Sequence, residues 1–159
     1  MPRKTDSTYD ETIAERGFRF TAQRRQVYDA LMAKRDHPTA VEVFMRVQKR
    51  MPTISLATVY NCLETLTECG LVRHVNHERE PSRYCPNLKP HGHFFCDECA
   101  AVFDVPLRKA MRLEQSWELP RDAVISNHDV SFRGLCPACA KKKKSGRQES
   151  RKTKPLKLS

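Results

Sequence analysis

Residues 85–99 read Cys85-Pro-Asn-Leu-Lys-Pro-His91-Gly-His93-Phe-Phe-Cys96-Asp-Glu-Cys99, and a second CxxC pair stands at Cys136-Pro-Ala-Cys139. Two CxxC pairs supply four thiolates, a ligand set that suits tetrahedral zinc. The four predicted ligands are Cys96, Cys99, Cys136 and Cys139. The 36 residues between the pairs exceed a zinc-ribbon loop and have room for a helix and a strand. We therefore expect a structural Zn²⁺ to join the last strand of a small domain to its first. A redox dithiol is the alternative use of these thiols.

A second cluster of ligands lies just before the first CxxC pair. His91 and His93 are two residues apart, so an extended strand would place both imidazoles on one side. Cys85 precedes them across a segment that contains two prolines. One thiolate with two imidazoles fits zinc best, with cobalt and ferrous iron as alternatives. A fourth ligand must come from elsewhere, and the candidates are His37, His74, Asp104 and His128.

The composition favours metal binding over disulfides. The chain of 159 residues has seven cysteines, no apolar stretch long enough to span a membrane, and a polar N-terminus without the apolar core of a signal peptide. We therefore expect a cytoplasmic protein with no membrane partner. In that compartment thiols stay reduced and CxxC pairs bind metal.

The net charge of +10 is concentrated at the C-terminus. Residues 141–159 contain nine Lys/Arg and one acidic residue, a net charge of +8, whereas the other 140 residues carry only +2. Because residues 141–159 have almost no apolar side chains, we expect a disordered basic tail. Such a tail would be attracted to phosphate backbones, or would simply keep the chain solvated.

Residues 1–85 are predicted to form helices followed by a hairpin. Capping residues and apolar spacing predict helices over residues 8–16, 22–33, 39–51 and 56–69. The period then changes, and residues 71–76 and 82–85 are typical of two short strands. This order is that of a winged helix-turn-helix domain.

Residues 86–90 are predicted to be a hinge, and residues 91–140 a second domain. Its pattern predicts a strand over residues 94–105, a helix over 107–117 and a strand over 123–133. A domain of roughly fifty residues buries little surface alone, so a metal ion, a dimer or both are expected to stabilise it.

The helix over residues 56–69 has a polar face suited to DNA. The residues on this face are Ser55, Thr58, Asn61 and Thr65, with Tyr60 beside them. Such side chains can reach base edges in a major groove through hydrogen bonds and methyl contacts. Arg19, just before a helix, could insert into a minor groove, and Arg24 and Arg25 suit phosphate contacts.

Together these residues resemble the ferric uptake regulator (Fur) superfamily of bacterial metal-responsive repressors over about residues 9–140. The matching motifs are Gly17-Phe-Arg-Phe-Thr-Ala-Gln-Arg24, His37-Pro-Thr-Ala40, Ser55-Leu-Ala-Thr-Val-Tyr60, His91-x-His93-x2-Cys96-x2-Cys99 and Cys136-x2-Cys139. The resemblance implies an α/β (α+β) fold, in which a winged helix-turn-helix domain is joined by the hinge to an α/β dimerisation domain. It also implies a homodimer that binds a pseudo-palindromic operator in double-stranded DNA. The four cysteines match its structural zinc site, residues 55–65 its recognition helix, and Arg19 its minor-groove arginine.

The resemblance also implies a regulatory metal site. His37, residue 85, His91, His93 and Asp104 match that of the peroxide-sensing (PerR) branch. The iron- and peroxide-sensing branches have a carboxylate at residue 85, whereas Cys85, six residues before His-x-His, resembles the zinc-uptake (Zur) branch. A thiolate shifts metal preference away from manganese and toward zinc. His74 is an alternative to His37 as the fourth ligand.

We therefore predict a zinc-sensing repressor of metal-uptake genes whose Zn²⁺-loaded dimer binds its operator. The alternative within the superfamily is a peroxide-sensing or iron-sensing repressor with Fe²⁺ or Mn²⁺ at the regulatory site. We expect no enzyme. A redox or zinc-hydrolytic activity is disfavoured because the sequence has no HExxH or deaminase-type pattern to accompany a catalytic zinc.

Overall fold

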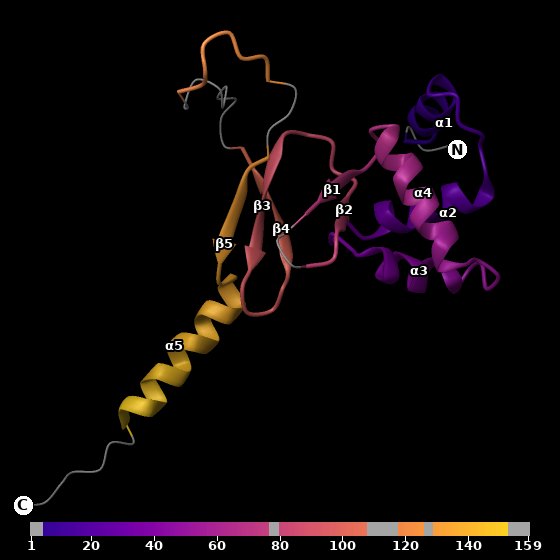
Figure 1. Cartoon of the computed structure of the whole chain (residues 1–159). Helices are drawn as coiled ribbons and strands as arrows, with labels where there is room; N and C mark the ends of the chain where they lie inside the picture. The colour runs from indigo at the N-terminus through magenta and orange to yellow at the C-terminus, as the bar shows by residue number, and fades with distance from the viewer. Residues whose placement is uncertain (1–4, 77–79, 108–117, 126–128, 153–159) are drawn as a thin grey trace, which may run out of the picture. The chain divides into compact units, whose positions relative to one another are not determined.

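The computed structural model describes residues 5–76, 80–107, 118–125 and 129–152, with side chains described within residues 9–145 of these ranges. The chain divides into two compact units, Met1–Lys89 and Pro90–Ser159. Helices dominate the first unit and a small sheet the second (Figure 1), which confirms the predicted mixed fold class. Within the described ranges, no helix has both the length and the apolar character needed to cross a bilayer.

Four helices build the first unit. They are α1 (Thr5–Glu15), α2 (Ala22–Ala33), α3 (Ala40–Gln48) and α4 (Leu56–Glu68). All four were predicted, although two have different ends. Helix α1 begins at Thr5 instead of residue 8, and α3 ends at Gln48 instead of residue 51. Gly17 after α1 has φ +74° and Gly70 after α4 has φ +71°, a left-handed conformation that glycine adopts without steric cost.

Side-chain caps fix where three of these helices begin. The Thr21 hydroxyl accepts a hydrogen bond from the Arg24 backbone N–H at α2, and the Ser55 hydroxyl accepts one from the Thr58 N–H at α4. At α3 the capping box is complete, because the Thr39 hydroxyl accepts from the Glu42 N–H and the Glu42 carboxylate accepts from the Thr39 N–H. Each cap satisfies backbone donors that the first helical turn leaves unpaired.

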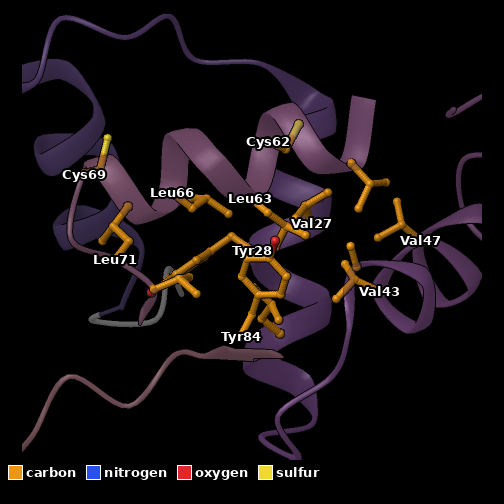
Figure 2. Close-up of a cluster of buried hydrophobic side chains, with 14 of the residues drawn as sticks. Val27, Tyr28, Val43, Val47, Cys62, Leu63, Leu66, Cys69, Leu71 and Tyr84 are labelled. Atoms are coloured by element: carbon orange, nitrogen blue, oxygen red, sulfur yellow. The ribbon is translucent and has the colours of Figure 1, made fainter. Parts of the chain in front are cut away.

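The core of the first unit lies where α2, α3 and α4 meet. Figure 2 shows side chains from all three helices and from Tyr84 of the hairpin in one cluster. Val27, Leu63 and Leu66 are completely buried there. Cys62 and Cys69 are also buried in this core, as predicted for small apolar residues. The packing holds α4 on α2 and α3 and leaves the opposite side of α4 exposed.

A short hairpin completes the first unit. Its strands β1 (Arg73–Val75) and β2 (Arg83–Cys85) pair antiparallel. The Tyr84 N–H donates to the Pro38 carbonyl at 3.0 Å, so β2 is also bonded to the segment that precedes α3. Helices followed by this hairpin form the predicted winged helix-turn-helix.

The second unit contains a three-stranded sheet. Its strands are β3 (His91–Cys96), β4 (Val102–Pro106) and β5 (Ser131–Gly134), in the order β4-β3-β5. Strand β3 pairs antiparallel with β4 and parallel with β5. The predicted single strand over residues 94–105 is therefore wrong. The first CxxC pair reverses the chain there: the Ala100 N–H donates to the Cys96 carbonyl and the Cys96 N–H to the Ala101 carbonyl, both at 3.0 Å.

Two further predictions of the second unit lie partly outside the described residues. These are the helix over residues 107–117, of which residues 108–117 are outside, and the strand over 123–133, of which 126–128 are outside. The described part of that strand pairs only from Ser131 onward.

The last element, α5 (Pro137–Lys152), corrects the prediction of a disordered tail. Residues 141–152 are helical, and residues 153–159 lie outside the described residues. Low hydrophobicity predicted disorder. However, Lys, Arg and Gln are good helix formers, and the helix begins inside the second CxxC pair, so its first turn is fixed by the fold.

Candidate metal centres and nucleic-acid interface

The four CxxC cysteines come together in the second unit. Cys96 ends β3, Cys99 lies in the turn before β4, and Cys136 and Cys139 stand at the start of α5. Their four sulfur atoms all lie within 4.8 Å of one another, as a common metal ion requires. Because β3 and β5 run parallel, both CxxC pairs leave the sheet at the same end. No disulfide joins any of the seven cysteines, all of which are described.

The protonation of these thiols fits a cation among them. The Cys136 backbone N–H donates to the Cys96 sulfur at 3.3 Å and lowers the pKa of Cys96 to about 6. The hydrogen bond of Cys139 to the Cys136 sulfur instead raises the pKa of Cys139 to about 12. Cys96 and Cys139 therefore differ in how readily they lose their protons. A divalent cation would replace those protons and let all four sulfurs bind as thiolates.

Three of the predicted regulatory ligands converge in the second unit. His91 and His93 lie on one face of β3, and Asp104 of β4 stands opposite His93. The two Nε2 atoms are 3.0 Å apart, and the Asp104 Oδ1 lies 3.3 Å from the His91 Nε2 and 3.9 Å from the His93 Nε2. The group is two imidazoles and one carboxylate on neighbouring strands, a set that binds first-row transition metals.

The other two predicted regulatory ligands pair within the first unit. The Arg83 guanidinium donates to the His37 carbonyl at 3.0 Å, which joins the segment before α3 to β2. His37 has φ +54°, a conformation that costs a non-glycine residue about 1–2 kcal/mol. With this backbone conformation, a nitrogen of the His37 ring lies within 4.8 Å of the Cys85 sulfur. Both side chains are buried, at 3% and 1% exposure, and the Asn87 N–H donates to the Cys85 sulfur at 3.4 Å.

His74, the alternative ligand, lies on the other face of this hairpin. It pairs with Tyr84 across the strands, whereas Arg73 pairs with Cys85. Side chains of adjacent residues in a strand point to opposite faces. The His74 ring packs edge-on against the Tyr84 ring, with centroids 4.8 Å apart. Within the first unit, the geometry therefore favours His37 over His74 as the partner of Cys85. His128 lies outside the described residues.

The exposed side of α4 carries only part of the predicted DNA-binding face. Tyr60 is 48% exposed and Asn61 is also exposed. The Ser55 and Thr58 hydroxyls lie 2.8 Å apart at the first turn of the helix. Thr65 is buried, and its hydroxyl donates to the Asn61 carbonyl, so the prediction that it faces solvent is wrong. Thr65 follows the period of the apolar residues that pack on α2, which sequence reasoning weighed too lightly.

The predicted arginines differ in their surroundings. Arg19 is exposed in the loop between α1 and α2. Arg24 is half-buried and has partners within the first unit: its guanidinium donates to the Arg19 carbonyl and to the Thr65 hydroxyl, and lies over the Phe18 ring. Arg25 is ion-paired with Asp29 at 3.0 Å. The sequence-based role of Arg24 and Arg25 as phosphate contacts does not fit these positions.

These features define a class of protein. A winged-helix unit with a polar, exposed helix is joined in one chain to a unit whose four cysteines suit zinc, as in metal-binding DNA-binding regulators. Residues 15–133 match the model of the ferric uptake regulator family. The chain belongs to this family, whose members are metal-responsive transcriptional repressors and not enzymes.

Individual relatives agree with this assignment. The peroxide operon regulator of Bacillus subtilis (strain 168) is 31% identical over 132 residues, which cover 83% of this chain and 91% of that protein. The ferric uptake regulator of Helicobacter pylori has a similar fold, with a TM-score of 0.71 at 18% identity, covering 84% of this chain and 90% of that one. A zinc uptake regulator in complex with zinc and DNA gives a TM-score of 0.65 at 22% identity, covering 90% and 99%.

Proposed function

We propose that this chain is a zinc-responsive repressor of metal-uptake genes that binds a pseudo-palindromic operator as a homodimer when zinc is bound. Family membership supports repression and metal response. The exposed Tyr60 and Asn61 on α4 and the exposed Arg19 support DNA contacts by the first unit. A structural neighbour that binds both zinc and DNA has the same fold.

We assign two zinc sites to the chain. Cys96, Cys99, Cys136 and Cys139 hold a structural ion, because four thiolates close a tetrahedral shell and leave no position for another ligand. Cys85, His37, His91, His93 and Asp104 form the regulatory site. The first two donors belong to the first unit and the other three to the second.

One observation carries the choice of metal: the Cys85 thiol stands beside the His37 ring at the end of β2. Hard ions such as Mn²⁺ prefer oxygen ligands, whereas a thiolate with imidazoles suits zinc. Zinc bound there would supply redox-inert coordination bonds and no other chemistry. Cys85 must give up its proton to bind, so occupancy is expected to increase with pH.

The proposed regulatory ligands come from both units, which explains how metal binding at this site would control DNA binding. When His37 and Cys85 share an ion with His91, His93 and Asp104, the orientation of the first unit is fixed relative to the second. In a dimer this sets the distance between the two α4 helices, which must be about 34 Å to enter successive major-groove faces. A coupling of about 1–3 kcal/mol between zinc and operator would produce the switch.

The test measures operator binding. The protein is first stripped of metal and then reloaded with Zn²⁺ at the structural site only. An operator is first selected from a random duplex pool in the presence of Zn²⁺. Binding is then titrated with Zn²⁺, Fe²⁺ or Mn²⁺. We expect activation by Zn²⁺ alone, and loss of activation in Cys85→Ala with dimer mass and structural zinc unchanged. Equal zinc activation of Cys85→Ala would reject the assignment of Cys85.

A second candidate is a peroxide-sensing repressor with Fe²⁺ or Mn²⁺. Two observations favour it: several relatives, at 29–31% identity, are peroxide-responsive regulators, and His91, His93 and Asp104 form a two-histidine, one-carboxylate set typical of non-haem iron. Peroxide treatment of the Fe²⁺-loaded protein separates the two. Oxygen addition to a ligand histidine, with loss of DNA binding, would support this candidate. The matched variant Cys85→Asp should move metal preference from zinc toward iron and manganese.

A further inference from the structure

Helix α5 carries a high positive charge and no apolar face. Its residues 141–152 contain seven Lys/Arg, one acidic residue and no apolar residue. The described side chains of this segment, 141–145, are all exposed. The segment also lies beyond residue 133, where the match to the family ends. Family membership therefore assigns no role to it.

The charges make α5 unfavourable as an isolated helix. Lys141 and Lys144 are three residues apart and therefore neighbours on the helix surface, where their like charges repel each other. A polyanion alongside α5 would remove this repulsion.

The start of α5 is nevertheless fixed. The helix begins at Pro137, between two cysteines of the zinc site, and the Ala140 N–H donates to the Cys136 carbonyl at 2.9 Å. Within the second unit, α5 leaves the end of β5 and runs away from the sheet (Figure 1). The cations of α5 are therefore presented to solvent from an anchored first turn.

We propose that α5 binds the phosphate backbone of duplex DNA as a sequence-independent contact. The inference rests on the proposed function, because DNA held by the winged-helix unit gives α5 a high local concentration of phosphate. An anionic membrane is the less suitable polyanion. Helices that lie on membranes insert an apolar face, and residues 141–152 have none.

The test compares the full chain with a variant in which Lys141, Lys142, Lys143 and Lys144 are all replaced by Gln. Binding to a random-sequence duplex is measured over a range of salt concentrations. Each lost phosphate contact reduces the slope of log affinity against log salt by about 0.9, so we expect a reduction of about 2–4 and at least tenfold weaker binding at low salt. The matched control replaces the same four lysines by Arg and should keep the slope. Zinc content and dimer mass report that the fold is intact.

Two results would overturn the proposal. An unchanged slope and affinity in the Gln variant would mean that α5 does not touch DNA. If the Gln variant binds DNA as the full chain does but no longer binds vesicles of phosphatidylglycerol and phosphatidylcholine, α5 would be assigned to a membrane surface instead. The proposed function has a separate test. It fails if the zinc-loaded wild-type protein selects no operator over random duplex, and this outcome does not depend on the salt slopes of the two variants.

Discussion

Replacing Arg24 by Gln should loosen the loop that carries Arg19 without removing a phosphate contact. The Arg24 guanidinium joins the Arg19 carbonyl, the Thr65 hydroxyl of α4 and the Phe18 ring. It thus connects the predicted minor-groove loop to the helix predicted to enter the major groove. Loss of these contacts should allow the loop to move relative to α4, and DNA binding should weaken because the loop must then be ordered on binding.

The cost can be worked from the contacts. A well-formed hydrogen bond from a charged group contributes about 1.5–3 kcal/mol. The Arg24 bond to Thr65 is long, at 3.4 Å, and Thr65 keeps its 3.0 Å bond to the Asn61 carbonyl, so no buried hydroxyl loses its only partner. The ring contact adds about 0.5 kcal/mol. We expect a loss of about 2 kcal/mol in the free energy of unfolding.

Two measurements check this prediction. Urea unfolding of the zinc-loaded chain, followed by far-UV circular dichroism, gives the stability loss. Operator binding at several salt concentrations should show affinity reduced about tenfold with an unchanged salt slope. The variant Arg24→Lys keeps the charge but loses the planar fork, and should behave like Arg24→Gln. Unchanged stability together with a slope reduced by about 0.9 in Arg24→Gln alone would refute the reasoning, because it would make Arg24 a direct phosphate contact.

Thr39, Tyr9 and Cys96 each give a further prediction, and Tyr9 gives two. Thr39→Ala removes the α3 capping box and should cost about 1 kcal/mol of stability in urea unfolding, whereas Thr39→Ser should cost little; equal losses would argue against the cap. The buried Tyr9 hydroxyl has no hydrogen-bond partner among the described residues, so Tyr9→Phe should keep or raise stability. Burial raises the pKa of Tyr9 to about 12, so wild-type stability should be lost as pH rises from about 10 toward 12, and a Tyr9→Phe profile identical to wild type in this range would contradict that cause. In metal-free protein, thiolate absorbance should appear near pH 6 and vanish from that range in Cys96→Ala; persistence in the variant would assign it elsewhere.

Local signals predicted the first unit well. The caps Thr21, Thr39 and Ser55 each start a helix at the expected residue, because side-chain and backbone groups a few positions apart determine a helix end. The sequence also pointed to the side chains that gather into two candidate metal-binding groups, since CxxC and HxH spacings place several thiols or imidazoles within reach of one ion.

Longer-range relations could not be predicted in the same way. The turn at Cys99 lacks glycine and proline and depends on hydrogen bonds between Cys96 and its neighbours, so the pattern suggested one strand instead of two. Arg24 looked like an exposed cation because its partner Thr65 is 41 residues away. His37 and Cys85 meet only because β2 bonds to the segment before α3, a pairing that no local pattern encodes.

The parallel pairing of β3 with β5 has a consequence for how this family of chains can vary. Cys99 and Cys136 stand 37 positions apart in sequence, so a metal ion bound to both would close a long loop. By the chain-entropy estimate for a covalent crosslink, this would reduce the conformational entropy of the unfolded chain by an amount worth about 4 kcal/mol. Loop-closure entropy depends only logarithmically on length, so doubling the loop would add only about 0.6 kcal/mol to that figure. Insertions between β4 and β5, within residues 107–130, should therefore be tolerated, whereas a shift of one residue inside either CxxC pair should not.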